Sequence, residues 1–482
     1  MVFLKEYYKK FLLVFIVYLI SFSSIIRANY SYNDDLGRSI DGHTWFRDQR
    51  WATIFLEHIL QLRISLTDIS PLPQILAIFI LSLSSCLIVY IYCKKKIPVI
   101  PLLCSLFIGL NPFAISNWCY KFDSLSMSFS ILFSIFPFLF FEKKYGFKLF
   151  CIIFCSEILV YTSYQPSSTI FLLMISAFIL KSVLTRKNIK KTLTKSLFYF
   201  ISYVVTILLL QLNNPKPGSS NFNTSLFSLN SIISGINLNI KRIYKYCFGS
   251  LNLTWFIFLF LFTLSMIIIV ILNSETLKVK IKSSLIVIFA FLIMTFLSVL
   301  LFFPLKNFLL GTRFFISFGC VLSIISIVIF SQNFKFTFKD WSKIQKILVL
   351  PTLLLIVSFV SFPLSLGNAL ADQKSYDEYR ISSLSGDLSN LNKDFKSAPT
   401  ILISGQLPLS PVMKHTADIF PIINHMDMTE RVGNYWGNLY FSKFADIQIN
   451  NSINCKDFKV VLQNSNQIIK TDGDNKFCIQ LK

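Results

Sequence analysis

The residue types best suited to chemistry in this chain lie close together at residues 32–38, Tyr-Asn-Asp-Asp-Leu-Gly-Arg. Two adjacent carboxylates, Asp34 and Asp35, are followed one helical turn later by Arg38. A carboxylate can act as the general base that takes a proton from a sugar hydroxyl, and an arginine can stabilise the negative charge on a phosphate leaving group. The alternative is structural, because Asn33 or Asp34 could cap a surface helix that starts at Asp35. The spacing leaves both interpretations open.

A second candidate is Glu157, the one acidic residue inside a predicted membrane span. Placing a carboxylate in lipid costs about 2.5 kcal/mol or more, so this side chain is expected to face the protein interior or a water-filled cavity. Tyr164 and Gln165 follow at the outer end of the same segment, where all three could contact a substrate. The alternative is that Glu157 is the structural partner of a hydroxyl group or an arginine in a neighbouring span.

Cations on the outer side of the membrane form a third group of candidates: Arg47, Arg50, Lys121, Lys306 and Arg313. Each by itself is typical of a solvated or headgroup-contacting charge. Together they run against the usual distribution of positive charge and favour an anionic partner, most simply a lipid phosphate. Trp118 is a candidate sugar-stacking residue, and the alternative is an aromatic residue of the membrane interface.

Composition indicates which elements must position these residues. Hydrophobic residues make up 54% of the 482 residues, charged residues 15%, and the mean hydropathy is +0.61. A soluble domain carries about 25% charged residues, and the long apolar blocks of this chain are typical of membrane spans. The net charge of +22 does not indicate nucleic-acid binding, because Lys and Arg lie between the apolar blocks and no recognisable nucleic-acid module is present.

The sequence therefore predicts an α-helical polytopic membrane protein. The first apolar segment follows Lys5, Lys9 and Lys10, and we expect an uncleaved span, because no small-residue cleavage pattern follows. About eleven spans are predicted: 11–26, 74–93, 98–116, 124–141, 149–164, 168–185, 196–212, 254–272, 285–304, 314–331 and 347–366. They form a membrane domain over residues 1–366, with a long first outer loop at 27–73.

The distribution of Lys and Arg predicts the orientation. With the N-terminus inside, the inner segments hold 22 of these residues and the outer segments before residue 367 hold 12. An odd number of spans then places residues 367–482 outside, in the periplasm of a bacterium. The expected topology is N-in and C-out.

Residues 367–482, called the tail, have balanced charge and are predicted to form a small α/β domain. We expect a helix at 372–395 and strands at 400–404, 458–463 and 476–481, the last two on either side of a turn at 471–474. Cys455 and Cys478 flank this turn, and we predict a disulfide, which an extracytoplasmic compartment permits. Zinc is not expected, because no Cys-x-x-Cys or paired-His spacing occurs.

Several segments in a fixed order resemble the serotype-converting O-antigen glucosyltransferases, the glucosyltransferase type II family, many of them phage-borne in enteric bacteria. The segments are 32–38, 51–59, 110–113, 117–118, 123–127 and 164–166. They cover roughly the first 190 residues, and the remainder is similar by topology.

The resemblance implies a membrane hexosyltransferase of the GT-C architecture in the bacterial inner membrane, with its active site facing the periplasm. Relatives use undecaprenyl-phosphate glucose as donor and decorate lipid-linked O-antigen, and a donor synthase and a small flippase usually accompany them. The family places its base in the first outer loop, which corresponds to Asp34 or Asp35. No residue of the tail can be assigned from the family.

These inferences combine into an inverting mechanism. An acceptor hydroxyl, deprotonated by Asp34 or Asp35, attacks the anomeric carbon, while Arg38, with Arg313 or Lys306, holds the leaving lipid phosphate. No cofactor is expected, and a divalent cation is allowed but not required, since arginine can neutralise a monophosphate. The alternatives are an O-antigen polymerase or ligase, or a polyprenyl-sugar transporter, although a transporter would usually show two repeated halves. The sequence leaves open which O-antigen hydroxyl is modified.

Overall fold

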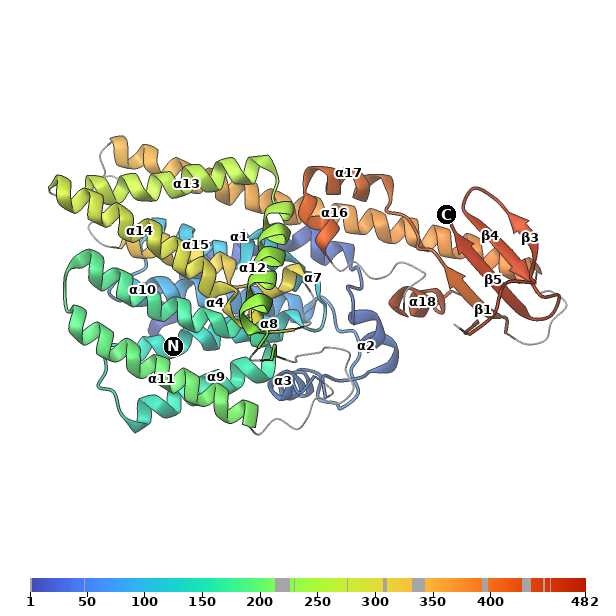
Figure 1. Cartoon of the computed structure of the whole chain (residues 1–482), viewed down its shortest axis with the longest axis horizontal. Coiled ribbons are helices and arrows are strands. Elements are labelled where there is room, and N and C mark those ends of the chain that lie inside the picture. Colours follow the sequence, from blue (N-terminus) through green and yellow to red (C-terminus); the bar gives the residue numbers. More distant parts are fainter. Residues whose placement is uncertain are drawn as a thin grey trace.

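Long apolar helices dominate the structure, because backbone polar groups in lipid must be hydrogen-bonded within the protein. The computed structural model describes residues 2–46, 48–212, 226–228, 230–274, 276–306, 310–331, 343–391, 398–426, 435–444, 447–450 and 452–482. Figure 1 shows a bundle of helices joined at one end to the tail.

The helices of the bundle run roughly along its length (Figure 1). They are α1 (Val2–Ala28), α4 (Leu72–Tyr92), α5 (Val99–Ser105), α6 (Phe107–Leu110), η1 (Pro112–Ala114), α7 (Ile115–Cys119), α8 (Ser124–Ile135), η2 (Phe136–Phe140), α9 (Phe147–Ser163), η3 (Gln165–Ser168), α10 (Thr169–Thr185), α11 (Ile189–Leu212), α13 (Leu253–Leu272), α14 (Leu277–Ser298), η4 (Leu300–Phe302), η5 (Thr312–Phe315), α15 (Phe318–Phe330) and α16 (Lys343–Leu391).

Each of the eleven predicted spans coincides with helical structure, but fewer helices are long enough to cross a membrane. Within the described ranges, eight helices have sufficient length and apolar character, and a ninth crossing results if 99–110 and 112–119, bent by 44°, count as one span. The predicted spans 124–141 and 149–164 correspond to helices of only 17 residues, about 25 Å at 1.5 Å per residue, less than a typical hydrocarbon core of about 30 Å. The count of eleven is not confirmed, and the N-in/C-out orientation stays a prediction.

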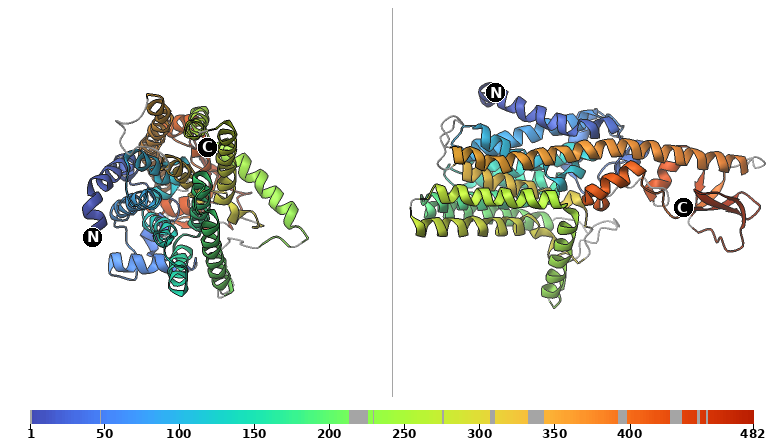
Figure 2. Two further views of the ribbon diagram at one scale, coloured as in Figure 1. Left: turned by 90° about the vertical axis from the view of Figure 1, so that its left-hand side faces the viewer. Right: turned by 90° about the horizontal axis from the view of Figure 1, so that it is seen from above.

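Helix α16 links the bundle to the tail. It is continuous over 49 residues, and Figure 2 shows it running along the bundle and on beside the tail sheet. The predicted boundary between residues 366 and 367 therefore falls inside a helix. At that level α16 packs tightly against α1: a Cβ on Gly367 would lie 2.3 Å from the backbone of Ser24 and Ile25, and the Ser24 hydroxyl donates to the carbonyl of Pro363 at 3.0 Å. Small residues allow this close approach of two apolar helices.

The tail contains a five-stranded sheet in the order β2-β1-β5-β4-β3. Its strands are β1 (Thr400–Ser404), β2 (Gln448–Ile449), β3 (Lys459–Gln463), β4 (Gln467–Thr471) and β5 (Lys476–Leu481). β1 pairs in parallel with β2 and β5, and β4 pairs antiparallel with β3 and β5. The described part of the tail also contains α17 (Pro411–Ile419), η7 (Pro421–His425) and α18 (Tyr435–Phe441). Buried residues of α17 and η7 belong to the core of the bundle, and α18 contributes to the core of the tail.

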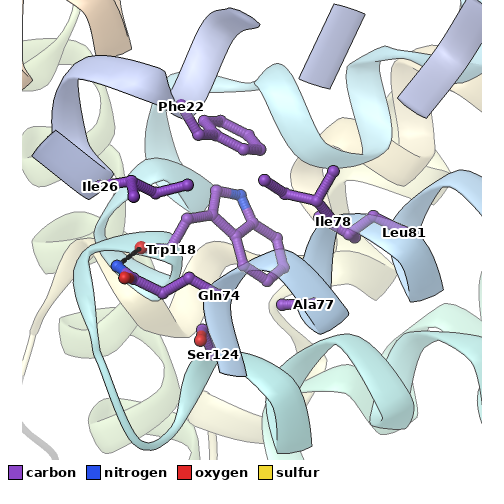
Figure 3. Close-up of a pocket in the computed structure, with 8 residues that line it drawn as sticks. All are labelled: Phe22, Ile26, Gln74, Ala77, Ile78, Leu81, Trp118 and Ser124. Atoms are coloured by element: carbon purple, nitrogen blue, oxygen red, sulfur yellow. Dashed lines mark hydrogen bonds between the residues drawn. The ribbon is translucent and has the colours of Figure 1, made fainter. Parts of the chain in front are cut away.

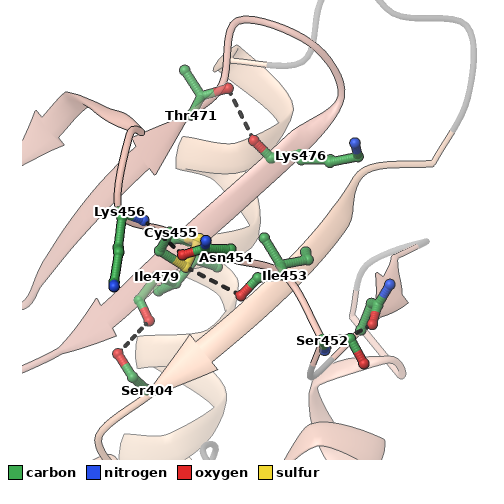
Figure 4. The surroundings of a disulfide bond; sticks show 11 residues. Ser404, Ser452, Ile453, Asn454, Cys455, Lys456, Thr471, Lys476 and Ile479 are labelled. Atoms are coloured by element: carbon green, nitrogen blue, oxygen red, sulfur yellow. Dashed lines mark hydrogen bonds between the residues drawn. A yellow bond between two sulfur atoms is a disulfide. The ribbon is translucent and has the colours of Figure 1, made fainter.

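The predicted strands at 400–404, 458–463 and 476–481 are confirmed as β1, β3 and β5, but β4 was not predicted. It lies between β3 and β5 in the sheet, so the turn after Thr471 joins β4 to β5. Figure 4 shows the disulfide that Cys455 and Cys478 form between the segment before β3 and strand β5, with a Cα–Cα distance of 6.1 Å. The disulfide holds the chain entering β3 against the middle of the sheet.

Candidate active site

The segment between α1 and α4, predicted as the first outer loop, folds onto the end of the bundle that lies nearest the tail (Figure 1). It contains α2 (Asp35–Asp41) and α3 (Trp51–Gln61). Helix α2 begins at Asp35, as predicted. Asp34 occupies the N-cap position, but its side chain makes no capping hydrogen bond. The Asp34 side chain therefore does not cap helix α2.

Asp35 is fully buried and is held by backbone donors. Its Oδ2 accepts from the N–H groups of Tyr32 and Lys121, each at 3.0 Å, and its Oδ1 accepts from the N–H of Phe122 at 3.3 Å. Burial raises the pKa of Asp35 to about 7, against the opposing effect of the N–H donors. Both oxygens are engaged, so the side chain fastens α2 to the segment before α8 and is not exposed to a substrate.

Arg38 lies between two carboxylates. Its Nη1 is 3.6 Å from Oδ2 of Asp34 and 3.3 Å from Oδ2 of Asp123, and its side chain is only 3% exposed. The guanidinium also stacks on Trp45, 4.4 Å from the ring centroid. Two carboxylates already neutralise this buried cation. Arg38 is therefore not available to hold the donor phosphate, which is the role that the sequence predicted for it. Its contacts instead orient the Asp34 carboxylate.

Asp123 is the centre of the arrangement. Its Oδ1 accepts from Trp45 Nε1 at 2.7 Å and from Arg50 Nη1 at 2.9 Å, while Oδ2 faces Arg38. We call Asp34, Arg38, Arg50 and Asp123 the charged cluster. Buried charges need a partner of opposite sign. Asp123 pairs with both arginines: Arg50 donates a hydrogen bond to its Oδ1, and Arg38 lies within ion-pair distance of its Oδ2.

Arg313 approaches the cluster from η5. It donates to the hydroxyl of Tyr120, which also accepts from Asn33 Nδ2 at 3.0 Å. Tyr164 donates to the Arg313 carbonyl at 2.8 Å, and Arg50 lies 5.7 Å from the Tyr164 ring. The side chain of Arg313 is half-buried. The structure thus brings Arg313 and Tyr164, both predicted as site residues, next to the charged cluster.

Glu57 of α3 is a further acidic side chain near the cluster. It is fully buried, its Oε2 accepts from Gln61 Nε2 at 3.2 Å, and Oε1 has no hydrogen-bond partner. Burial, with a smaller contribution from the charge of Asp123, raises the pKa of Glu57 to about 7, a value suited to proton transfer. Its complete burial keeps it from direct contact with an acceptor sugar.

Three predicted residues lie apart from the cluster. Lys306 is exposed on the segment after α14, and in the described structure no hydrogen bond or ion pair links it to Arg38 or Arg313. Gln165 is exposed at the start of η3. Glu157 is fully buried inside the bundle, and neither carboxylate oxygen has a hydrogen-bond partner. No described contact joins Glu157 to the charged cluster.

Trp118 lies inside the protein rather than on a binding surface. Figure 3 shows its ring among apolar side chains of α1 and α4, including Phe22 and Ile78. Its Nε1 donates to the Gly109 carbonyl at 2.9 Å, and the residue is 4% exposed. The adjoining pocket, of about 10 Å³, has room for roughly one water molecule. The sugar-stacking role predicted for Trp118 therefore does not fit, because its neighbours enclose the ring.

Leu36 connects the site to the tail. It is fully buried in the hydrophobic core of the tail, although it lies between Asp35 and Arg38 in sequence. The same core contains residues of α16, α18 and the sheet, among them Ile381, Phe441 and Phe477, and α2 packs against α18. The tail and the charged cluster thus share one short helix, α2.

Comparison with known proteins shows to which family the chain belongs. The family model for the glucosyl transferase GtrII family matches residues 23–324, which include every member of the charged cluster and Arg313. The chain belongs to this family. A protein of Salmonella phage P22, described as an uncharacterized 55.3 kDa protein in the gtrB 5′ region, is 30% identical over 234 residues. That match covers 45% of this chain and 46% of the phage protein, so the chain spans about half the length of this relative. No solved structure matches the chain.

Sequence reasoning missed Asp123 as a site residue, as well as Trp45 and Glu57. Asp123 had a detectable signal, because it is an acidic residue at the start of an apolar segment and belongs to one of the family-like motifs. Glu57 had the same kind of signal, because it lies in the family-like segment 51–59, whereas Trp45 lies in none of these segments. Within the described residues, no group of three or more His, Cys, Asp or Glu side chains is arranged to hold a metal ion.

Replacing Asp35 with Asn should destabilise the protein. The amide nitrogen would face one of the three backbone N–H donors, and a buried donor left without an acceptor costs about 1–3 kcal/mol. We expect a lower midpoint of thermal unfolding for the detergent-solubilised protein. Asp41→Asn, at an exposed position of the same helix, is the matched control. Equal midpoints for the two variants would contradict the anchoring role of Asp35.

Replacing Leu36 with Ala should loosen the tail, because truncating a buried leucine costs about 2–5 kcal/mol. Limited proteolysis should cleave the tail of the variant faster than that of the unmodified protein. Leu62→Ala, in the same loop but 89% exposed, is the matched control and should leave the rate unchanged. A Leu36→Ala protein with unchanged cleavage would show that the shared core does not hold the tail in place.

Proposed function

We propose that the protein transfers glucose from undecaprenyl-phosphate glucose to a sugar of lipid-linked O-antigen, with inversion of the anomeric centre. Membership of the glucosyl transferase GtrII family supports the transfer of glucose. The reaction takes place on the periplasmic side of the bacterial inner membrane, which the distribution of Lys and Arg supports. A donor synthase and a small flippase would supply the lipid-linked glucose on that side.

The exposure of the acidic side chains favours Asp34 as the general base. Asp35, Glu57 and Asp123 are fully or almost fully buried, whereas the Asp34 side chain is 31% exposed. Only a carboxylate that reaches the surface can contact the hydroxyl of a large saccharide. The sequence left Asp34 and Asp35 as equal candidates, and their burial favours Asp34.

The chemical step then needs few groups. The acceptor hydroxyl oxygen attacks the anomeric carbon of the donor glucose and gives its proton to Asp34. The bond from that carbon to the phosphate oxygen breaks, and its electron pair stays on the lipid phosphate. Arg38, 3.6 Å from Asp34, orients the base throughout.

Arg313 is the best-placed cation for the leaving phosphate. It lies beside the charged cluster and, unlike Arg38, is half-buried rather than enclosed between carboxylates. Exposed apolar side chains of α3, among them Trp51, Phe55 and Ile59, are suited to the lipid interface at the level of the donor phosphate. We therefore assign the lipid phosphate to the space between Arg313 and the membrane surface.

Asp34→Asn should lower transfer by about 10²–10⁴-fold, the usual contribution of a general base, while protein remains folded in the membrane. Transfer would be measured with membranes that contain the variant, undecaprenyl-phosphate glucose and lipid-linked O-antigen. Asp41→Asn changes a carboxylate on the same helix and should retain full activity. Full activity of the Asp34→Asn variant would show that Asp34 is not the general base.

The mass of the O-antigen repeat, with and without the gene, tests the reaction itself. We expect a gain of one hexose. A change in chain length without a change in repeat mass would support the polymerase alternative. Neither change, together with movement of a lipid-linked sugar across vesicles that contain the purified protein, would support a transporter. Either outcome would reject the proposed transfer.

A further inference from the structure

Helix α12 (Ile232–Ser250) has a different orientation from the rest of the bundle. Figures 1 and 2 show it, in light green, running across the direction of α13, near the end of the bundle where the tail begins. It precedes α13, one of the eight helices able to cross a membrane. A helix that lies across the spans at the end of a membrane bundle lies parallel to the bilayer plane, at the depth of the lipid headgroups.

One face of α12 is fixed to the protein, so the helix cannot turn freely about its axis. Asn239 donates to the carbonyls of Phe302, Phe303 and Leu305 at 3.2, 3.0 and 2.8 Å. Tyr246, on the same face, donates to the His425 carbonyl at 3.1 Å. These contacts determine which residues of α12 point away from the protein.

The outward residues include an apolar stripe. Ile233, Ile240, Tyr244 and Phe248 follow at spacings of seven and four, which places them on one side of a helix. All four are exposed, from 40% for Ile240 to 83% for Ile233. Exposure of four apolar side chains to water is unfavourable, so this stripe is expected to contact an apolar partner. Lipid beside α13 is the nearest such partner.

A basic stripe runs next to the apolar one. Lys241 and Lys245, one turn apart, are both exposed, and no described acidic side chain forms an ion pair with either. The sequence contains no Asp or Glu between residues 226 and 274. The adjacent charge is therefore uncompensated within this segment and is complementary to an anion.

We propose that α12 lies in the membrane interface and binds anionic phospholipid headgroups through Lys241 and Lys245, with its apolar stripe inserted among the acyl chains. An amphipathic helix with apolar and basic sides binds anionic bilayers in this way. The binding site is independent of the proposed glucosyl transfer. It would hold the segment next to Phe302 and Leu305 at a constant depth in the membrane.

Titration of the full-length protein in detergent with phosphatidylglycerol, followed by native mass spectrometry, tests the proposal. Each lysine near an anionic surface contributes a factor of about five, so K241Q/K245Q should weaken phosphatidylglycerol binding by about 25-fold. K241R/K245R should keep the affinity. K456Q/K459Q removes the same charge from exposed positions of the tail and should also keep it.

Four outcomes would overturn the proposal. Unchanged phosphatidylglycerol binding by K241Q/K245Q would remove the two lysines from any lipid site. Equal binding of phosphatidylcholine, or displacement of phosphatidylglycerol by millimolar inorganic phosphate, would mean that an anionic lipid headgroup is not what the site selects. Conversion of a dimer into a monomer by Ile240→Asp would assign the apolar stripe to a second copy of this chain.

Discussion

Buried charge must be paired, and the segment between α1 and α4 is built around this constraint. Asp34 and Asp123 together balance the charges of Arg38 and Arg50, and Asp35 takes its hydrogen bonds from three backbone N–H groups instead of from a cation. A loop of this length could adopt many conformations in water. Here two carboxylates are paired with two guanidinium groups, because an unpaired charge in the protein interior is costly.

Because buried charge must be paired, the adjacent carboxylates Asp34 and Asp35 have different surroundings. Asp35 points inward and fastens α2 to the segment before α8, while Asp34 points toward the surface and pairs with Arg38. In the proposed reaction Asp34 is the base, and its neighbours Asp35, Arg38 and Asp123 hold it in place. A base that accepts a proton from a bulky saccharide must be both accessible and fixed, and these conditions are met by adjacent residues of one short helix.

The tail contributes to this arrangement from a distance in sequence of more than 300 residues. Leu36 belongs to the core formed by α16 and α18, and α16 extends from the membrane bundle into the tail without interruption. The tail is therefore coupled to α2 through packing, and to α1 through the close contact at Gly367. This coupling gives the tail a means of influencing the position of the proposed base.

The sequence by itself determined that the chain is helical and membrane-embedded, that residues 32–38 are the chemical candidates, and that β1, β3 and β5 occur in the tail. These features are local: apolar length, residue type and strand alternation act over short stretches of chain. The pairing of Asp123 with two arginines and the burial of Trp118 depended on contacts between distant segments. The proposal of Asp34 rather than Asp35 as the general base also depended on these contacts. The spacing of residues does not indicate which of two adjacent carboxylates the fold will bury.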